Sequence, residues 1–247
     1  MAIEPDQIKA VIFDYGNTLI EFTATQVHSL DRAIAESMGS VFGPFDPLKY
    51  AALRRDAYRS PYSHPELRES TIEGLLADLV RQLYARDPRP GELDRIIAVH
   101  DERFPMLIEA PEYLDAFLER LGRRYRLAVV SNYPCGRSIR ASLHRTGIAR
   151  RVQSIVVSGE VGHVKPHPLP FRTALAQLDL PPHQALFVGD NWLGDIQGAK
   201  RLGMFAAHTL QFDTLELFDR EHGHHDADLT LRHLTELEAH LKPRDGE

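Results

Sequence analysis

The chain has 247 residues, more than a typical single domain and fewer than two domains of ordinary size, so one domain with a sizeable insertion is expected. Hydrophobic residues make up 43% of the chain and charged residues 26%, values typical of globular proteins, which excludes a disordered or fibrous chain. The formal net charge of -6 disfavours nucleic acid as a partner, because a protein that binds a phosphate backbone needs excess positive charge.

The first predicted strand covers Ala10 to Phe13 and ends in a polar loop that begins at Asp14. Residues 22–105 contain amphipathic stretches, among them 26–38, 47–59 and 71–84, but no convincing strand. Residues 87–91 (DPRPG) have the composition of a loop between two helices. We therefore predict an inserted helical domain over residues 22–105.

After the insertion, apolar segments alternate with helical stretches. The predicted strands are 126–130, 154–157, 185–188, 205–210 and a last short one at 227–231, and the helices are 111–123, 135–146, 169–178 and 195–202. The longer strands are apolar throughout, which is typical of parallel strands buried on both faces. The pattern predicts an α/β fold with a doubly wound parallel sheet, formed by residues 1–21 and 106–247.

Polar residues follow several of these strands directly. Asp14, Ser131, Asn132 and Asp190 all lie at strand ends. In open α/β sheets ligands bind beyond the carboxyl ends of the strands, so the sequence places the candidate site there.

Four motifs at these positions, taken in order, resemble those of the haloacid dehalogenase superfamily, in the subgroup whose helical cap follows the first strand. They are Phe13-Asp14-Tyr15-Gly16-Asn17-Thr18-Leu19, Val129-Val130-Ser131-Asn132, Gly162-His163-Val164-Lys165-Pro166, and Val188-Gly189-Asp190 with Asp195 five residues further on. The resemblance covers nearly the whole chain and implies a hydrolase with a Rossmann-like core.

The resemblance also implies roles for individual residues. Asp14 would be the nucleophile that forms an aspartyl phosphate, and a carboxylate of ordinary pKa is ionised and able to attack at neutral pH. Ser131, Asn132 and Lys165 would bind the phosphoryl group and stabilise its transition state, because they offer hydrogen-bond donors and a positive charge. Backbone N–H groups from Tyr15 to Thr18 would add an anion-binding nest.

A magnesium site is expected beside the nucleophile. Carboxylates placed close together repel one another unless a cation offsets their charge, and their oxygens suit Mg²⁺. By resemblance, the ligands would be Asp14, the backbone carbonyl of Gly16, Asp190 and Asp195, the last either directly or through water. An alternative for Asp195 is that it caps the helix that follows it.

Gly16 departs from the phosphatases of this superfamily, most of which carry a second aspartate two residues after the nucleophile. That aspartate protonates the leaving oxygen, and loss of a general acid lowers a rate by about 10²- to 10⁴-fold. His28, His64 or Glu21 could supply the proton instead, or the substrate could have an acidic leaving group.

Other readings keep the fold and change the function. Dehalogenases of the family lack the second aspartate, but they use no metal, which leaves the Asp190 and Asp195 pair without a purpose. A phosphonate hydrolase would use a cap lysine, and Lys49 is the only lysine of the proposed cap. A third reading is a protein that binds a phosphorylated metabolite without turning it over.

The expected partner is a small phosphorylated molecule, with Mg²⁺ as cofactor. The single cysteine, Cys135, excludes an intrachain disulfide framework and fits a reducing compartment. No apolar run is long enough to span a bilayer and the start of the chain does not resemble a signal peptide, so a cytoplasmic protein without a membrane partner is expected. Residues 222–225 contain three histidines, which we interpret as a polar loop rather than a metal site.

Overall fold

A computed structural model describes residues 5–212 and 226–241. Its centre is a six-stranded parallel sheet in the order β3-β2-β1-β4-β5-β6. The strands are β1 (Ala10–Phe13), β2 (Arg126–Ser131), β3 (Ser154–Val157), β4 (Ala185–Gly189), β5 (Phe205–Thr209) and β6 (Leu229–Leu231). All six predicted strands are therefore confirmed, and the parallel α/β fold with them.

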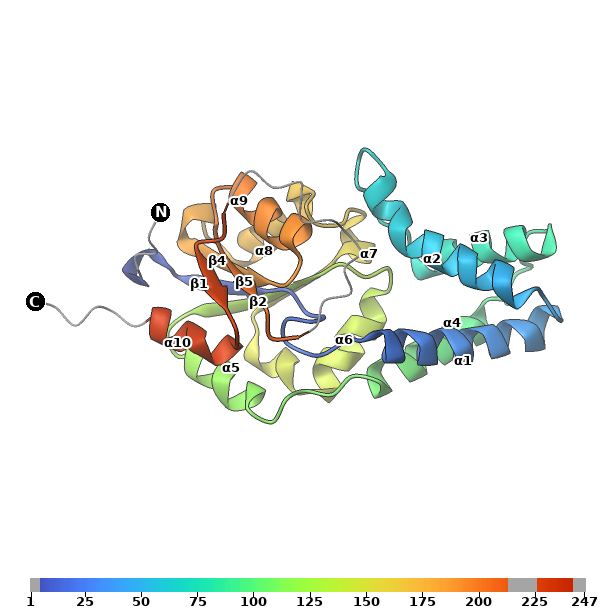
Figure 1. The fold of residues 1–247 in the computed structure, drawn as a ribbon, viewed down its shortest axis with the longest axis horizontal. Helices are drawn as coiled ribbons and strands as arrows, with labels where there is room; N and C mark the ends of the chain where they lie inside the picture. Colours follow the sequence, from blue (N-terminus) through green and yellow to red (C-terminus); the bar gives the residue numbers. More distant parts are fainter. Residues whose placement is uncertain (1–4, 213–225, 242–247) are drawn as a thin grey trace, which may run out of the picture.

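Helices cover both faces of the sheet (Figure 1). One face packs against α5 (Leu114–Gly122), α6 (Gly136–Arg145) and α10 (Leu237–His240), and the other against α8 (Pro168–Leu178) and α9 (Gly198–Arg201). Alternate residues of β1 enter the two cores, Val11 and Phe13 on the first side and Ala10 and Ile12 on the second. Burial on both faces explains why the strand is apolar throughout.

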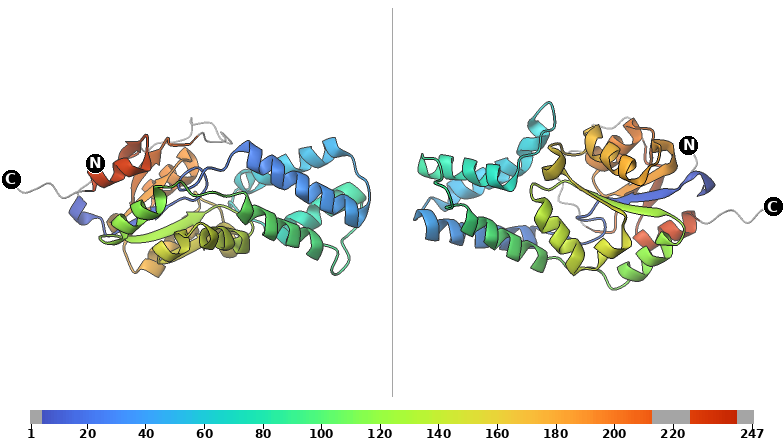
Figure 2. Two further views of the ribbon diagram at one scale, coloured as in Figure 1. Left: turned by 90° about the horizontal axis from the view of Figure 1, so that it is seen from below. Right: turned by 180° about the vertical axis from the view of Figure 1, so that it is seen from behind.

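Five helices lie between β1 and β2; the last of them, α5, covers the sheet, and we call the first four the cap. They are α1 (Ala24–Phe42), α2 (Pro47–Ser63), α3 (Ile72–Tyr84) and α4 (Asp94–Met106). Two begin at side chains that accept a hydrogen bond from the first turn, Asp46 from Leu48 N at 2.9 Å and Thr71 from Gly74 N at 3.2 Å. The cap projects beyond the sheet on the side where β1 ends, in all three views (Figures 1 and 2).

The segment between α2 and α3 pairs with the core like a short strand. Leu67 O accepts a hydrogen bond from Val164 N at 2.9 Å, and Glu69 N donates one to Gly162 O at 3.0 Å. Arg68 and His163 thereby form an isolated antiparallel bridge. We call residues 64–71 the docking segment.

Most predicted helices are found with boundaries shifted by a few residues, and three differences are larger. The helix predicted from Pro111 begins at Leu114, because residues 111–113 form a turn in which Leu114 N donates to Pro111 O. The helix predicted over 195–202 is a π-helical turn, Trp192–Gln197, followed by α9. The insertion also contains α4, which was not among the stretches named from the sequence. None of the helices in the described ranges is long and apolar enough to cross a membrane.

Candidate active site

The predicted site residues meet at the carboxyl ends of the central strands. Asp14 directly follows β1, Ser131 ends β2 and Asp190 directly follows β4. Because β1 lies between β2 and β4 in parallel register, these three ends are neighbours. The side chains of Lys165 and Asp195 complete the group and are only 2% and 1% exposed.

Lys165 is the buried centre of the site. Its Nζ lies 2.6 Å from Asp14 Oδ1, 2.7 Å from Asp195 Oδ1 and 2.8 Å from the carbonyl oxygen of Val130. Burial alone would lower the pKa of Lys165, but the charges of Asp14 and Asp195 outweigh burial and raise that pKa. Lys165 is therefore a permanent cation against the predicted nucleophile.

The side chain of Asp195 fits in its place only because residue 189 is a glycine. A Cβ atom at Gly189 would lie 2.3 Å from Asp195 Oδ2, so a larger residue could not stand there. The same oxygen accepts a hydrogen bond from Asn191 N at 3.0 Å. Asn191, and not Asp195, caps the following turn, because its side chain accepts from Gly194 N. The alternative role of Asp195 as a helix cap is therefore wrong.

Asp14, Asp190 and Asp195 form a buried acidic cluster that fits a metal ion. Each offers an oxygen, and these oxygens lie within 4.8 Å of one another. Burial and the charges of Asp14 and Asp195 raise the pKa of Asp190 well above its usual range, and burial raises the pKa of Asp195 to about 6. Asp195 Oδ1 is buried and is paired with Lys165 Nζ at 2.7 Å, but that one cation faces three carboxylates. A hard divalent cation would relieve the remaining repulsion among them.

Besides Lys165, the substrate-binding residues predicted from the sequence are Ser131, Asn132 and, through its backbone N–H, Thr18, and their side chains are placed differently. Ser131 is buried at the end of β2 and lines the cavity described below. Asn132 Oδ1 accepts from Lys165 N at 2.8 Å, and its Nδ2 donates to Lys165 O and to Tyr62 Oη, both at 3.0 Å. Thr18 is fully buried, does not line the cavity, and donates to Asp190 Oδ1 at 3.4 Å. Asn132 and Thr18 thus hold other site residues in place.

The loop after β1 is folded tightly around Asn17. Asn17 has φ of 56°, in the left-handed region that asparagine tolerates, and its side chain accepts from Phe22 N at 2.9 Å. The backbone of Gly16 is not in the left-handed region. A Cβ atom there would meet Phe22 Cβ at 3.7 Å, an ordinary contact, so the absence of an acid at this position does not follow from lack of space.

A cavity of about 700 Å³ lies between the core and the cap, with the acidic cluster in its wall. Its cap wall includes Arg54, Tyr58, Tyr62 and Glu69. Arg54 is paired with Asp31 at 2.6 Å, and both line the cavity. Tyr62 and Glu69 are not among the site residues predicted from the sequence. No local motif marks them, because only the docking of the cap brings them to the core.

Of the alternative residues named from the sequence, only His28 lies at the cavity, where it is exposed. His64 and Glu21 are exposed and do not line the cavity. Lys49 is exposed, does not line the cavity, and donates to the carbonyl oxygen of Gln82. The position of Lys49 counts against the phosphonate hydrolase reading. Residues 222–225, with their three histidines, lie outside the described residues.

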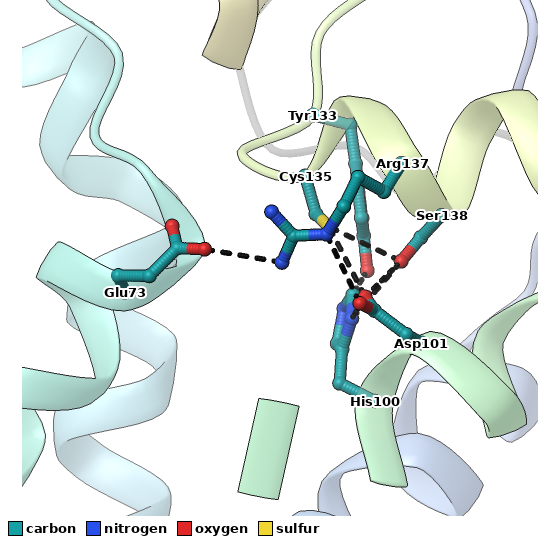
Figure 3. Close-up of polar contacts among 7 residues, drawn as sticks. All are labelled: Glu73, His100, Asp101, Tyr133, Cys135, Arg137 and Ser138. Carbon is teal, nitrogen blue, oxygen red and sulfur yellow. Dashed lines mark hydrogen bonds and ion pairs between the residues drawn. The ribbon is translucent and has the colours of Figure 1, made fainter. Parts of the chain in front are cut away.

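A second polar cluster joins the cap to the core (Figure 3). His100 Nε2 lies 2.9 Å from Tyr133 Oη, and Asp101 accepts from Ser138 Oγ at 2.8 Å. Arg137 bridges Asp101 at 3.1 Å and Glu73 of α3 at 3.0 Å. His100, Asp101 and Cys135 have the ligand types of a metal site, but the Arg137 guanidinium already balances the Asp101 charge, so the cluster needs no cation.

Comparison with known proteins gives consistent matches. A model of the haloacid dehalogenase-like hydrolases matches residues 8–203 of the chain. The chain is 27% identical over 202 residues to the glyceraldehyde 3-phosphate phosphatase of Methanopyrus kandleri, covering 80% of this chain and 82% of that protein. It is 35% identical over 229 residues to the phosphoserine phosphatase of Thermus thermophilus, covering 81% and 87% respectively.

Solved structures agree on the fold. A 2-haloacid dehalogenase from Pseudomonas syringae superposes with a TM-score of 0.69 at 20% identity, covering 95% of this chain and 98% of that chain. A HAD phosphatase from Thermococcus onnurineus gives a TM-score of 0.68 at 21% identity, covering 96% and 99%. At such identities the similarity establishes the fold and not the reaction.

Proposed function

This chain belongs to the haloacid dehalogenase-like hydrolase family, and from that premise we propose that it is a Mg²⁺-dependent phosphatase of small phosphorylated metabolites. The observation that carries the proposal is the contact of Asp14 with the buried Lys165, beside the Asp190 and Asp195 carboxylates. A dehalogenase, which uses no metal, would leave that acidic cluster without a role. The core would comprise residues 1–21 and 106–247, and the cap residues 22–105.

The proposed first step is attack by Asp14 on phosphorus. An Asp14 carboxylate oxygen forms a bond to phosphorus while the bond to the leaving oxygen breaks, and the leaving oxygen takes up a proton, which gives an aspartyl phosphate and the alcohol product. Lys165 stabilises the negative charge on the transferred group, and the Ser131 hydroxyl and the backbone N–H groups of Tyr15, Gly16 and Thr18 donate to its oxygens. The N–H of Asn17, also predicted for this nest, donates to Ile20 O at 2.7 Å instead. Water then attacks the aspartyl phosphate, releasing inorganic phosphate and regenerating Asp14.

The acidic cluster would hold Mg²⁺ through Asp14, the Gly16 carbonyl oxygen, Asp190 and Asp195. When bound, the ion would neutralise phosphate charge that otherwise repels the anionic nucleophile. Thr18 keeps Asp190 oriented through its hydrogen bond, and Gly189 leaves room for Asp195. The chain therefore supplies both the ligands and the groups that position them.

The experiment that tests this function is phosphate release from 4-nitrophenyl phosphate. This ester has an acidic phenol as its leaving group, so its cleavage depends on the nucleophile and the charge-stabilising groups and needs little help from a proton donor. We expect turnover with Mg²⁺ and its loss when a chelator is added. A folded protein that releases no phosphate from a panel of phosphomonoesters would contradict the proposal.

Magnesium should also stabilise the fold. At a concentration 100 times its dissociation constant, a ligand that binds only the folded state adds about 2.7 kcal/mol to the free energy of unfolding. For a chain of this size, that corresponds to a rise in melting temperature of about 5–10 °C. Thermal unfolding with Mg²⁺ and with chelator measures the rise.

Asp190→Asn should abolish this rise, because it removes a proposed ligand. Asp56→Asn is the matched control, since Asp56 is an exposed carboxylate of the cap, and it should respond to Mg²⁺ like the native chain. An equal rise in all three proteins would place the ion elsewhere.

A further inference from the structure

Glu69 differs from the other carboxylates in the wall of the cavity. Asp14 and Asp195 contact Lys165, Asp190 belongs to the same cluster, and Asp31 is paired with Arg54. The recorded partners of the Glu69 carboxylate are neutral. Its Oε2 accepts from Ser158 Oγ at 2.8 Å, and its Oε1 accepts from Ser70 N at 3.0 Å.

The docking segment fixes Glu69 at the side of the cavity where the phosphoryl group would bind. The backbone N–H of Glu69 donates to Gly162 O, three residues before Lys165. Ser158, which holds the carboxylate, also accepts from Tyr133 N at 2.7 Å, so Glu69 is linked to the residue directly after Ser131 and Asn132. Glu69 therefore enters the cavity wall from the docking segment, beside Ser158 at the end of β3, and the same cavity is lined by Asp14.

We propose that Glu69 is the general acid and base of the reaction, in place of the side chain that Gly16 lacks. The proposal rests on the phosphatase function proposed above. When Asp14 attacks, the electron pair of the breaking P–O bond goes to the leaving oxygen, and that oxygen takes the proton of the Glu69 carboxyl group. In the second step, the Glu69 carboxylate accepts a proton from the attacking water as the bond between phosphorus and Asp14 breaks, which restores both groups.

The surroundings of Glu69 suit this role. Burial raises the pKa of Glu69 to about 7, although the hydrogen bonds from Ser158 and Ser70 act in the opposite direction. The groups that face it are the Ser158 hydroxyl from the core, the Ser70 amide of its own segment and the Tyr62 phenol of α2, whose pKa is also raised, chiefly by burial. A carboxyl group in these surroundings can both give and accept a proton near neutral pH.

Two histidines also line the cavity: His28 is exposed, and His100 is buried. His100 Nε2 faces Tyr133 Oη and its Nδ1 faces Ser138 and Asp101, so both ring nitrogens are engaged in the cluster of Figure 3. Burial lowers the pKa of His100, which favours the neutral imidazole, a much weaker acid than the imidazolium. Glu69 is the better acid.

The test compares two esters of similar size, 4-nitrophenyl phosphate and benzyl phosphate, in the native chain and in Glu69→Gln. The phenol leaves without protonation, whereas the alkoxide needs a proton. We expect Glu69→Gln to lower kcat/KM for benzyl phosphate by about 100-fold or more and to leave 4-nitrophenyl phosphate within a few-fold. Glu66→Gln is the matched control, because Glu66 is an exposed acid of the same segment, and it should affect neither ester.

The pH dependence gives a second readout that a structural role would not produce. The acid form of Glu69 is required and is lost above pH 7, so native kcat/KM for benzyl phosphate should fall about tenfold per pH unit there. In Glu69→Gln, kcat/KM for benzyl phosphate should not show this fall above pH 7. Gly16→Asp in the Glu69→Gln background should recover part of the benzyl phosphate activity, since a Cβ at Gly16 meets no close contact.

The outcomes separate the two proposals. Equal losses for both esters, or no loss for either, would overturn the role of Glu69 and leave the phosphatase function standing. Native cleavage of the aryl ester alone would also overturn that role, because it would mean that no proton donor operates. If the native chain cleaved neither ester, the phosphatase function would fail, and the role of Glu69 with it.

Discussion

Asp14→Asn is expected to lower kcat for 4-nitrophenyl phosphate by about 10⁴-fold or more, the scale seen when a covalent nucleophile is removed. An amide oxygen carries no negative charge and cannot form the aspartyl phosphate. The variant should fold, because Asn is nearly isosteric with Asp and Lys165 keeps its contacts with Val130 O and Asp195. Steady-state and single-turnover phosphate release would measure the loss.

The control for this variant is Asp56→Asn, which removes an exposed carboxylate and should retain native turnover. Activity of Asp14→Asn within tenfold of the native chain would exclude every mechanism in which Asp14 is the nucleophile. If neither protein turned over phosphate esters but both bound them equally well, the reading of a protein that binds a phosphorylated metabolite without catalysis would be supported instead.

Lys165→Met is expected to destabilise the chain by about 3–5 kcal/mol as well as to abolish turnover. Lys165 is 2% exposed and lies between Asp14 and Asp195, so its removal leaves two carboxylates buried without a counter-charge. For a chain of this size, the loss corresponds to a fall in melting temperature of about 6–20 °C. Thermal and urea unfolding in the presence of a chelator would measure it.

Mg²⁺ should recover part of the stability of Lys165→Met, because the ion would replace some of the missing positive charge, but it should not restore turnover. A matched control is Arg123→Met. The Arg123–Glu119 pair is well exposed, at 71% and 44%, so its loss should cost less than about 1 kcal/mol. A melting temperature unchanged by Lys165→Met would contradict the balance of charges described for the site.

Much of the core could be predicted from the sequence because its signals are local. Segments such as Ala10–Phe13 and Ala185–Gly189 are short, apolar and followed at once by polar residues, as buried parallel strands are. The parallel order of the sheet then brings Asp14, Ser131 and Asp190 together without further information. The role of Lys165 was predicted from its motif. The structure adds that the Asn132 side chain is hydrogen-bonded to both the backbone N–H and the carbonyl oxygen of Lys165.

The cap side of the site could not be predicted, because it depends on contacts between residues far apart in the sequence. Tyr62 meets Asn132 and Glu69 meets Ser158 only when the docking segment lies against the core. Nothing near Glu69 in the sequence distinguishes it from the exposed Glu66. The α4 helix was missed for a different reason, since Pro105 near its end and its many charged residues weaken the apolar pattern.

The strand-like pairing of the docking segment has a consequence for the exchange of caps between related proteins. The cap does not end at its two connections to the core, since Leu67 and Glu69 are also bonded to Val164 and Gly162. A chimera that receives a foreign cap but keeps the native residues 162–164 would pair a foreign docking segment with native residues that did not evolve to bond to it. Transplanting those three residues together with the cap would keep the register of the pairing. The segment to be exchanged between related proteins is therefore the cap plus residues 162–164, which are not continuous in the sequence.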